Sequence, residues 1–259
     1  MDGRRRFLQL AGASLVGAGI GVPVLGALGR ARASGPASDA GRAGRRAMVV
    51  DPTKCLGQGV CNACQMACHR AHNVPRIDNP RHEIKWIWKE PYESAFPDEI
   101  HAYTEDALRE QPVVVLCNHC ASPPCVRVCP TRATFKRESD GLVMMDMHRC
   151  VGCRYCMAAC PYGARSFNFV DPSPHVQGMH DGFPTRMKGV VEKCNFCAER
   201  LAKGMEPACV EACRAQGAGA LSFGDPDAPG SAVAKLLRSR HALRRKPSLG
   251  TDPNVFYLV

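Results

Sequence analysis

The sequence predicts an α+β fold built from two small cysteine-rich modules with loop-rich insertions, after an N-terminal signal peptide. Three observations support this fold: 16 cysteines fall into groups of four, short apolar stretches flank each group, and an apolar segment after three arginines opens the chain. Disulfide scaffolds are mostly short chains that bury little core, whereas 259 residues with 45% apolar content can bury one. The cysteines therefore favour a metal cofactor.

The N-terminal segment has the features of an export signal. Arginines at 4–6 precede Phe7 and Leu8, a glycine-rich apolar run continues to Leu28, and "ARAS" offers a small-x-small cleavage site. The segment resembles a twin-arginine (Tat) signal, which implies export of a folded protein to the periplasm. A Sec signal and an uncleaved membrane anchor remain alternatives. We assign residues 1–33 to the signal and 34–47 to a linker; no later stretch could span a bilayer.

The cysteines form four groups along the chain. These are Cys55, Cys61, Cys64 and Cys68; Cys117, Cys120, Cys125 and Cys129; Cys150, Cys153, Cys156 and Cys160; and Cys194, Cys197, Cys209 and Cys213. Group three, "CVGCRYCMAACP", reproduces the C-x2-C-x2-C-x3-C-P run of bacterial ferredoxins, whose fourth cysteine ligates a second [4Fe-4S] cluster. We expect clusters at groups two and four as well. Group four is the one group whose spacing approaches that of a zinc site, so zinc remains an alternative there.

Group one has an unusually wide gap between its first two cysteines. Its leading residues, "MVVDPTKC" (48–55), match "VMMDMHRC" (143–150) before group three, and groups two and four share "CN-x-C". Strand-like runs also follow the groups, so the repeating unit is strand, cysteine loop, short helix, strand. Cys55 thus takes the position of Cys150, and we interpret the gap as a loop insertion. The alternative leaves Cys55 off the cluster, with a three-iron centre or none.

The charge and the remaining motifs argue against other functions. The formal charge of +10 falls to +6 without residues 1–33, and four clusters at about −2 each would bring the total near −2. The basic residues are thus explained without nucleic acid. No C-x2-C pair is followed by His, as haem attachment would need, and no nucleotide loop or catalytic triad stands out. The nine His are expected at the surface or beside ligands, and Asp51 and Asp146 in turns or caps.

The four-group arrangement resembles the four-cluster iron–sulfur subunits of bacterial respiratory complexes, a family that includes subunits of dimethyl sulfoxide, polysulfide and tetrathionate reductases. The resemblance covers residues 48–224, and the tail "PSLGTDPNVFYLV" is similar to the family's C-terminal strand. Four stretches, "AHNVP", "KWIWKE", "FKRESDGLVMMD" and "FPTRMKGVVEKC", are most similar to the DsrO branch of the family. That branch comprises periplasmic subunits of the DsrMKJOP membrane complex.

This resemblance implies four [4Fe-4S] clusters in two ferredoxin-like modules, with the fourth cysteine of each group exchanged within a pair of groups. The implied ligand sets are Cys55, Cys61, Cys64 with Cys213; Cys194, Cys197, Cys209 with Cys68; Cys117, Cys120, Cys125 with Cys160; and Cys150, Cys153, Cys156 with Cys129. The first module would take 48–112, with an insertion, and 171–224; the second would take 113–170. Residues 225–259 would form a C-terminal helix and tail.

The resemblance also implies a function and partners. The chain would be no enzyme by itself but an electron-transfer subunit, relaying electrons between an integral membrane quinone-reactive subunit (NrfD/DsrP-like) and a multihaem cytochrome c (DsrJ-like) of a DsrMKJOP complex in dissimilatory sulfur metabolism. The runner-up is the iron–sulfur subunit of a molybdopterin polysulfide or tetrathionate reductase, or of a nitrite-reductase-linked quinol dehydrogenase. A cluster enzyme reducing a small molecule and a zinc or disulfide structural protein are further alternatives, and metal content separates the last from the others.

Two tryptophans lie in the insertion between groups one and two, residues 69–112. In "KWIWKEPY", Trp86 and Trp88 would share one face of a strand, opposite Lys85, Ile87 and Lys89. Such a face suits either a partner interface or the cover of a module of the same chain. The sequence leaves both interpretations open.

Overall fold

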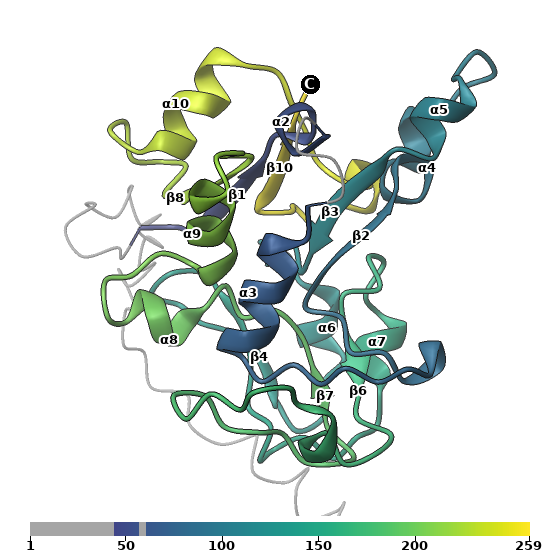
Figure 1. Cartoon of the computed structure of the whole chain (residues 1–259), viewed down its shortest axis with the longest axis vertical. Coiled ribbons are helices and arrows are strands. Elements are labelled where there is room, and N and C mark those ends of the chain that lie inside the picture. Colours follow the sequence, from purple (N-terminus) through teal and green to yellow (C-terminus); the bar gives the residue numbers. More distant parts are fainter. Residues whose placement is uncertain (1–43, 57–60) are drawn as a thin grey trace, which may run out of the picture. The chain divides into compact units, whose positions relative to one another are not determined.

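The computed structural model of the chain describes residues 44–56 and 61–259 (Figure 1). The predicted twin-arginine signal at 1–33 lies outside the described residues, as do most of the linker and the middle of the gap between Cys55 and Cys61. No helix within the described ranges is long and apolar enough to cross a bilayer.

Each cysteine group lies in a unit of the same order. The strands that lead into the groups are β1 (Ala47–Val50), β3 (Pro112–Leu116), β5 (Val143–Met145) and β7 (Val191–Glu192), and those that follow are β2 (Ile87–Pro91), β4 (Thr134–Lys136), β6 (Ser166–Phe167) and β8 (Leu221–Gly224). Between them lie α2 (Pro52–Leu56) and α3 (Ala63–Ala71), α6 (Pro124–Arg127), α7 (Tyr155–Ala158), and α8 (Ala198–Leu201) with α9 (Ala208–Ala215). The predicted repeat of strand, cysteine loop, helix and strand is confirmed.

The strand pairings connect the four units in a cycle. The second strand of each unit pairs antiparallel with the first strand of the next, as β2 with β3, β4 with β5, and β6 with β7. The cycle closes where β8 pairs antiparallel with β1. Helices α3 and α9 pack against each other, as Figure 1 shows, and so do α6 and α7. The helices after groups one and four therefore lie together, as do those after groups two and three.

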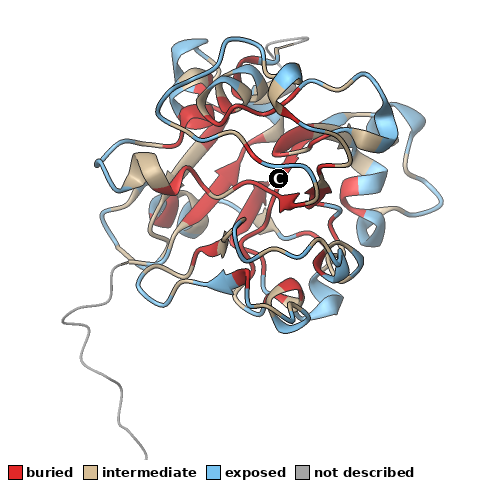
Figure 2. Cartoon of the chain, turned by 90° about the horizontal axis from the view of Figure 1, so that it is seen from below, coloured by how far each residue is buried: buried red, intermediate tan, exposed pale blue. Residues whose placement is uncertain are grey.

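The C-terminal segment completes the largest sheet. It contributes α10 (Ala232–Ser239), β9 (Ala242–Leu243) and β10 (Val255–Leu258), and the sheet has the order β8, β1, β10, β9. Strand β10 runs parallel to β1. Alternate residues of β1 face opposite sides: Ala47 and Val49 pack with Val233 of α10, while Met48 and Val50 enter the main core. Both faces are thus covered, and Figure 2 shows the buried residues concentrated along these strands.

The insertion between groups one and two packs onto the core. Besides β2 it holds two short helices, α4 (Tyr92–Ala95) and α5 (Asp106–Arg109), and two 3-10 turns, Pro80–His82 and Pro97–Glu99. Two further 3-10 turns, Ser173–His175 and Pro247–Leu249, lie later in the chain. Trp86 and Trp88 are only 1% and 7% exposed, and Ile87 between them is 2% exposed. The partner-interface interpretation of the two tryptophans is therefore wrong. Because Ile87 and Trp88 point to opposite faces and both are buried, the start of the strand has no free side, although Lys89 and Glu90 are half-buried.

Candidate metal centres

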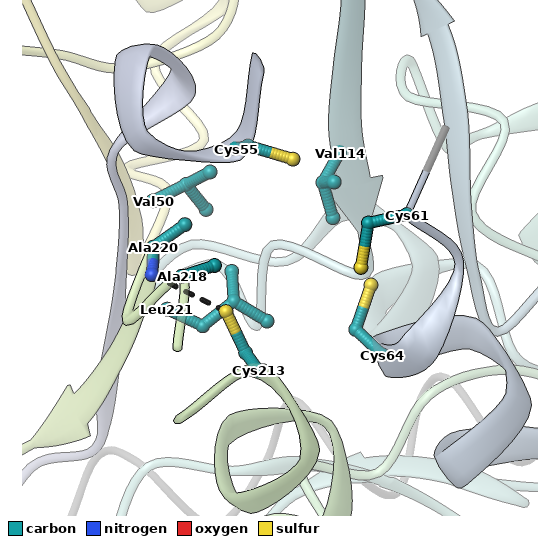
Figure 3. A pocket seen from close by; sticks show the side chains of 9 residues that line it. All are labelled: Val50, Cys55, Cys61, Cys64, Val114, Cys213, Ala218, Ala220 and Leu221. Carbon is teal, nitrogen blue, oxygen red and sulfur yellow. Dashed lines mark hydrogen bonds between the residues drawn. The ribbon is translucent and has the colours of Figure 1, made fainter. Parts of the chain in front are cut away.

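Four cysteines from two distant groups line one apolar cavity (Figure 3). Cys55 lies on α2, Cys61 lies two residues before α3, Cys64 lies in the first turn of α3, and Cys213 lies on α9. Their side chains point into the shared space, which Val50, Val114 and Leu221 also line. The backbone N–H of Ala220 donates a hydrogen bond of 3.2 Å to Cys213 Sγ. We call these four cysteines set A.

A second cavity is lined by Cys129, Cys150, Cys153 and Cys156, which we call set D. Cys129 comes from group two and the other three from group three. Burial would raise the pKa of Cys129, but hydrogen bonds from the Thr134 N–H, at 3.4 Å, and from Thr131 hold this pKa below its usual value. An N–H aimed at the sulfur stabilises the thiolate, which is the form that binds metal.

The remaining eight cysteines form two further sets. Set B consists of Cys68, Cys194, Cys197 and Cys209: burial, and then the charges of the other three thiolates, raise the pKa of Cys68 well above its usual value. Set C consists of Cys117, Cys120, Cys125 and Cys160: burial and the charges of Cys117, Cys125 and Cys160 raise the pKa of Cys120 to about 12, although Thr251 donates a hydrogen bond to it. The structure thus brings together the same four sets that the family resemblance implies.

The sets follow one another in space in the order A, B, C, D. After burial, the charge of Cys64 in set A contributes to the raised pKa of Cys209 in set B. The charge of Cys117 in set C acts in the same direction on Cys194 in set B. Cys125 in set C likewise raises the pKa of Cys156 in set D. Coulombic influence decays with distance, so these thiols indicate which sets are neighbours.

The donor sets fit iron–sulfur clusters. All sixteen cysteines are free, so the disulfide alternative finds no support. The four cysteines of group four do not converge, because Cys213 joins set A while the others join set B, and the zinc interpretation of that group is therefore wrong. Buried thiols with raised pKa values do not ionise at neutral pH unless a positive centre stabilises the thiolate. A metal cluster supplies such a centre.

The backbone of the cysteine loops adopts conformations that turn the thiols inward. Arg154, Phe196 and Cys197 have φ values of 61°, 55° and 53°. Gly152, with φ of 70°, passes so close to the Gly189 carbonyl that a Cβ would lie 2.5 Å from its oxygen. Only glycine satisfies both conditions without strain.

Two histidines lie beside the sets: His119, which stands inside "CNHC" in the sequence, and His72, which no sequence pattern indicated. His119, from the loop between Cys117 and Cys120, is fully buried and stacks on Phe196 with ring centroids 3.8 Å apart. Burial, and then the charge of Lys193, hold the His119 pKa well below its usual value, so the ring is neutral and links the loops of sets B and C. The predicted position beside ligands is confirmed for this histidine.

His72 lies beside set B. Burial would lower its pKa, but hydrogen bonds with Cys197 and Glu199 raise it to about 9. His72 Nε2 lies 2.8 Å from Glu199 Oε1, and these two side chains with Cys197 could also hold a metal ion. Because Cys197 already belongs to set B, we regard His72 and Glu199 as its surroundings. Neighbours this distant in sequence carry no local signal.

The two aspartates before the loops have the roles expected from the sequence. Asp51 Oδ1 accepts hydrogen bonds from the Thr53 hydroxyl at 2.6 Å and from the Lys54 N–H at the start of α2, and its other oxygen pairs with Arg240. Asp146 accepts a hydrogen bond from the His148 N–H. Both are turn and cap residues.

Comparison with known proteins agrees with this geometry. The model of the 4Fe-4S dicluster domain matches residues 112–171 and 182–226. The chain is 41% identical over 274 aligned positions to the Hdr-like menaquinol oxidoreductase iron-sulfur subunit 1 of Archaeoglobus fulgidus, covering 99% of this chain and 98% of the relative. It is 38% identical to the iron-sulfur cluster-binding subunit of the menaquinone reductase of Nitratidesulfovibrio vulgaris, with 82% and 87% covered. It is also 38% identical to a component of the polysulfide reductase of Wolinella succinogenes, with 81% and 91% covered.

These relatives are iron–sulfur subunits of oxidoreductase complexes, and they match the chain across the cysteine groups described above. The match supports an electron-transfer subunit and not a catalytic one. The chain therefore belongs to the family of 4Fe-4S electron-transfer subunits of membrane respiratory oxidoreductases.

Proposed function

We propose that the chain holds four [4Fe-4S] clusters, one in each of sets A to D, with all sixteen cysteines as ligands, and passes electrons along that order. The exposure of the cysteines is the observation that carries this proposal. Every cysteine of set B is buried, whereas Cys153 of set D is exposed and Cys55 and Cys61 of set A are half-buried. An electron-transfer path needs accessible ends and an insulated middle, and in the two middle sets all cysteines but the half-buried Cys160 are buried.

The clusters would supply one-electron chemistry, and the residues of the chain would hold and insulate them. Apolar side chains such as Val50 and Val114 exclude water from set A, and N–H groups from Ala220 and Thr134 stabilise sulfur. The packing of α3 on α9 and of α6 on α7 supports an arrangement of two ferredoxin-like modules, sets A and B in one, sets C and D in the other.

The test is anaerobic purification followed by iron and labile-sulfide analysis and EPR spectroscopy. Four clusters require about 16 iron and about 16 sulfide per chain. About eight iron would support only a two-cluster protein. Zinc, or no metal, would overturn the proposal.

We further propose that the subunit works in the periplasm after Tat export, in a complex with an NrfD/DsrP-like quinone-reactive membrane subunit and a DsrJ-like multihaem cytochrome c, in dissimilatory sulfur metabolism. Support comes from the arginines at 4–6 and from the stretches similar to DsrO proteins. The similarity to the Wolinella protein supports a second candidate, in which the chain is the iron–sulfur subunit of a polysulfide reductase. Replacing Arg4 and Arg5 by lysine should leave cofactor-bearing protein in the cytoplasm. Undiminished delivery would contradict a Tat signal, and the proteins that co-purify separate the two complexes.

The surface beside set D is the proposed contact for one redox partner. Val151 and Tyr155 flank the exposed Cys153 and are 67% and 63% exposed, an unusual exposure for apolar side chains beside a cofactor site. Replacing both by serine should release an iron-replete subunit from its membrane complex. The matched control is Tyr103→Ser, because Tyr103 is 91% exposed but lies between α4 and α5. Unchanged co-purification of the Val151 and Tyr155 variant would contradict this contact.

A further inference from the structure

Four lysine and arginine side chains are buried among the described residues, and they differ in their counter-charges. Arg186 and Arg245 each pair with a glutamate, Arg186 Nη2 with Glu192 Oε2 at 2.7 Å and Arg245 with Glu90. Arg165 and Lys193, 4% and 2% exposed, form no ion pair with any carboxylate of the described residues. A buried charge without a partner is costly. Their counter-charge must therefore be something other than a carboxylate.

Arg165 makes its contacts with cysteine sulfur. Its Nη2 donates to Cys125 Sγ of set C at 3.1 Å, and its Nη1 donates to Thr134 Oγ1 at 3.0 Å. The same guanidinium reaches set D: burial raises the pKa of Cys156, and the charge and a hydrogen bond of Arg165 act in the opposite direction. Arg165 thus donates directly to a ligand sulfur of set C, and its charge also acts on a thiol of set D.

Lys193 is likewise a buried cation without a carboxylate partner, and it lies where sets B and C are neighbours. Its Nζ donates to the carbonyl oxygen of Cys194 of set B at 2.7 Å and to that of Val143. The N–H of Val143 in turn donates to His119, in the loop of set C. Two buried cations without carboxylates therefore lie at two successive contacts between sets. Arg165 is the one bonded directly to sulfur.

We propose that Arg165 is the counter-charge of the set C and set D sites and raises the reduction potential of the clusters held there. This inference rests on the proposed function. A cluster with four thiolates carries about −2 when oxidised and about −3 after it accepts one electron from the neighbouring carrier. The guanidinium keeps its proton throughout, so no proton accompanies the electron. Its attraction grows with the added charge, and it therefore stabilises the reduced form more than the oxidised form.

The experiment is EPR-monitored redox titration of the anaerobically purified protein with Arg165→Gln and Arg165→Lys. In Arg165→Gln, at the wild-type midpoint potential, the ratio of reduced to oxidised cluster should fall at least tenfold for one or two of the signals. This corresponds to a negative shift of about 59 mV for a one-electron couple. The shift should not depend on pH. Arg165→Lys keeps the charge but loses the fork that donates to Cys125 and Thr134, so a smaller shift in the same signals is expected.

The matched control is Arg127→Gln. Arg127 follows Cys125 by two residues but is exposed on α6, so solvent screens its charge. In Arg127→Gln, the ratio of reduced to oxidised cluster at the wild-type midpoint potential should therefore stay within threefold of the wild-type ratio for every signal. Full iron content with unchanged potentials in Arg165→Gln would overturn the role of Arg165 and leave the four-cluster proposal intact. If Arg165→Gln does not assemble, Arg165→Met decides, because it also removes the charge but keeps a side chain of similar length: a negative shift supports the inference, and unchanged potentials overturn it. Wrong iron content in the wild-type protein would instead contradict the proposed function.

Discussion

Replacing Glu192 by glutamine tests the buried charge cluster that fixes the insertion to the cysteine modules. The Glu192 carboxylate is fully buried and accepts three hydrogen bonds, from Trp86 Nε1 at 2.8 Å, from Asn168 Nδ2 at 2.6 Å and from Arg186 Nε at 2.8 Å, and it forms an ion pair with Arg186 Nη2 at 2.7 Å. These contacts use both oxygens of the charged carboxylate, whereas a glutamine offers one oxygen and adds a competing donor. Removing one partner of a buried ion pair costs about 3–5 kcal/mol.

The assay is loss of cluster absorbance in increasing urea, under anaerobic conditions. With a denaturant slope of about 2–3 kcal/mol per molar, the Glu192→Gln midpoint should fall by about 1–2.5 M. A double variant, Glu192→Leu with Arg186→Met, should regain most of the loss because no charge remains unpaired. Glu206→Gln is the control, since its pair with Arg214 lies at the surface and contributes less than about 1 kcal/mol. A wild-type midpoint for Glu192→Gln, or a double variant no more stable than the single one, would refute this reasoning.

Three further outcomes are expected. Cys55→Ala should lower the iron content or convert one centre to a three-iron EPR signal, and an unchanged spectrum would remove Cys55 from set A. Gly152→Ala should reduce the iron loading of set D, because the added Cβ meets the Gly189 carbonyl at 2.5 Å; full loading would show that the loop can shift. Asp51→Asn should cost about 1–2 kcal/mol through its lost charge on Arg240. Burial would raise the pKa of Asp51, but hydrogen bonds and the charge of Arg240 lower it below the usual 3.8. The cost of Asp51→Asn should therefore stay constant between about pH 6 and about pH 8 and disappear only as the pH falls through the lowered folded-state pKa. A cost that varies between these two pH values would contradict this reasoning.

The repeat and the site were accessible from the sequence because both follow local rules. Cysteine spacing fixes which thiols a tight loop brings together, and the match of "MVVDPTKC" to "VMMDMHRC" indicated the strand before each loop. The exchange of Cys68 and Cys213 between groups one and four came from family resemblance instead. The contact of α3 with α9 that produces it joins segments far apart in the chain.

The environment of the site was not accessible in the same way. The alternation of Trp86 and Trp88 suggested a free face, but periodicity cannot distinguish a half-buried strand from one covered on both sides. Arg165, Lys193 and Glu192 are single charged residues, which sequence patterns assign to the surface by default. Their burial depends on partners about 40 to 110 positions away, Cys125 for Arg165 and Trp86 for Glu192. Isolated basic residues directly beside apolar, cysteine-rich runs were the one available hint.

The parallel pairing of β1 with β10 means that the largest sheet can be completed only at the end of synthesis. Strand β1 leaves the ribosome early, but its neighbour β10 is made about 200 residues later, and Cys213 follows Cys64 by about 150 residues. At about 5–20 residues per second, three thiols of set A wait about 7–30 s for their fourth. Throughout that interval the nascent polypeptide exposes unpaired sulfur and an open sheet edge. Cluster insertion at set A therefore has to be post-translational or nearly so, and a reducing compartment with protection from premature aggregation is a requirement of its biogenesis.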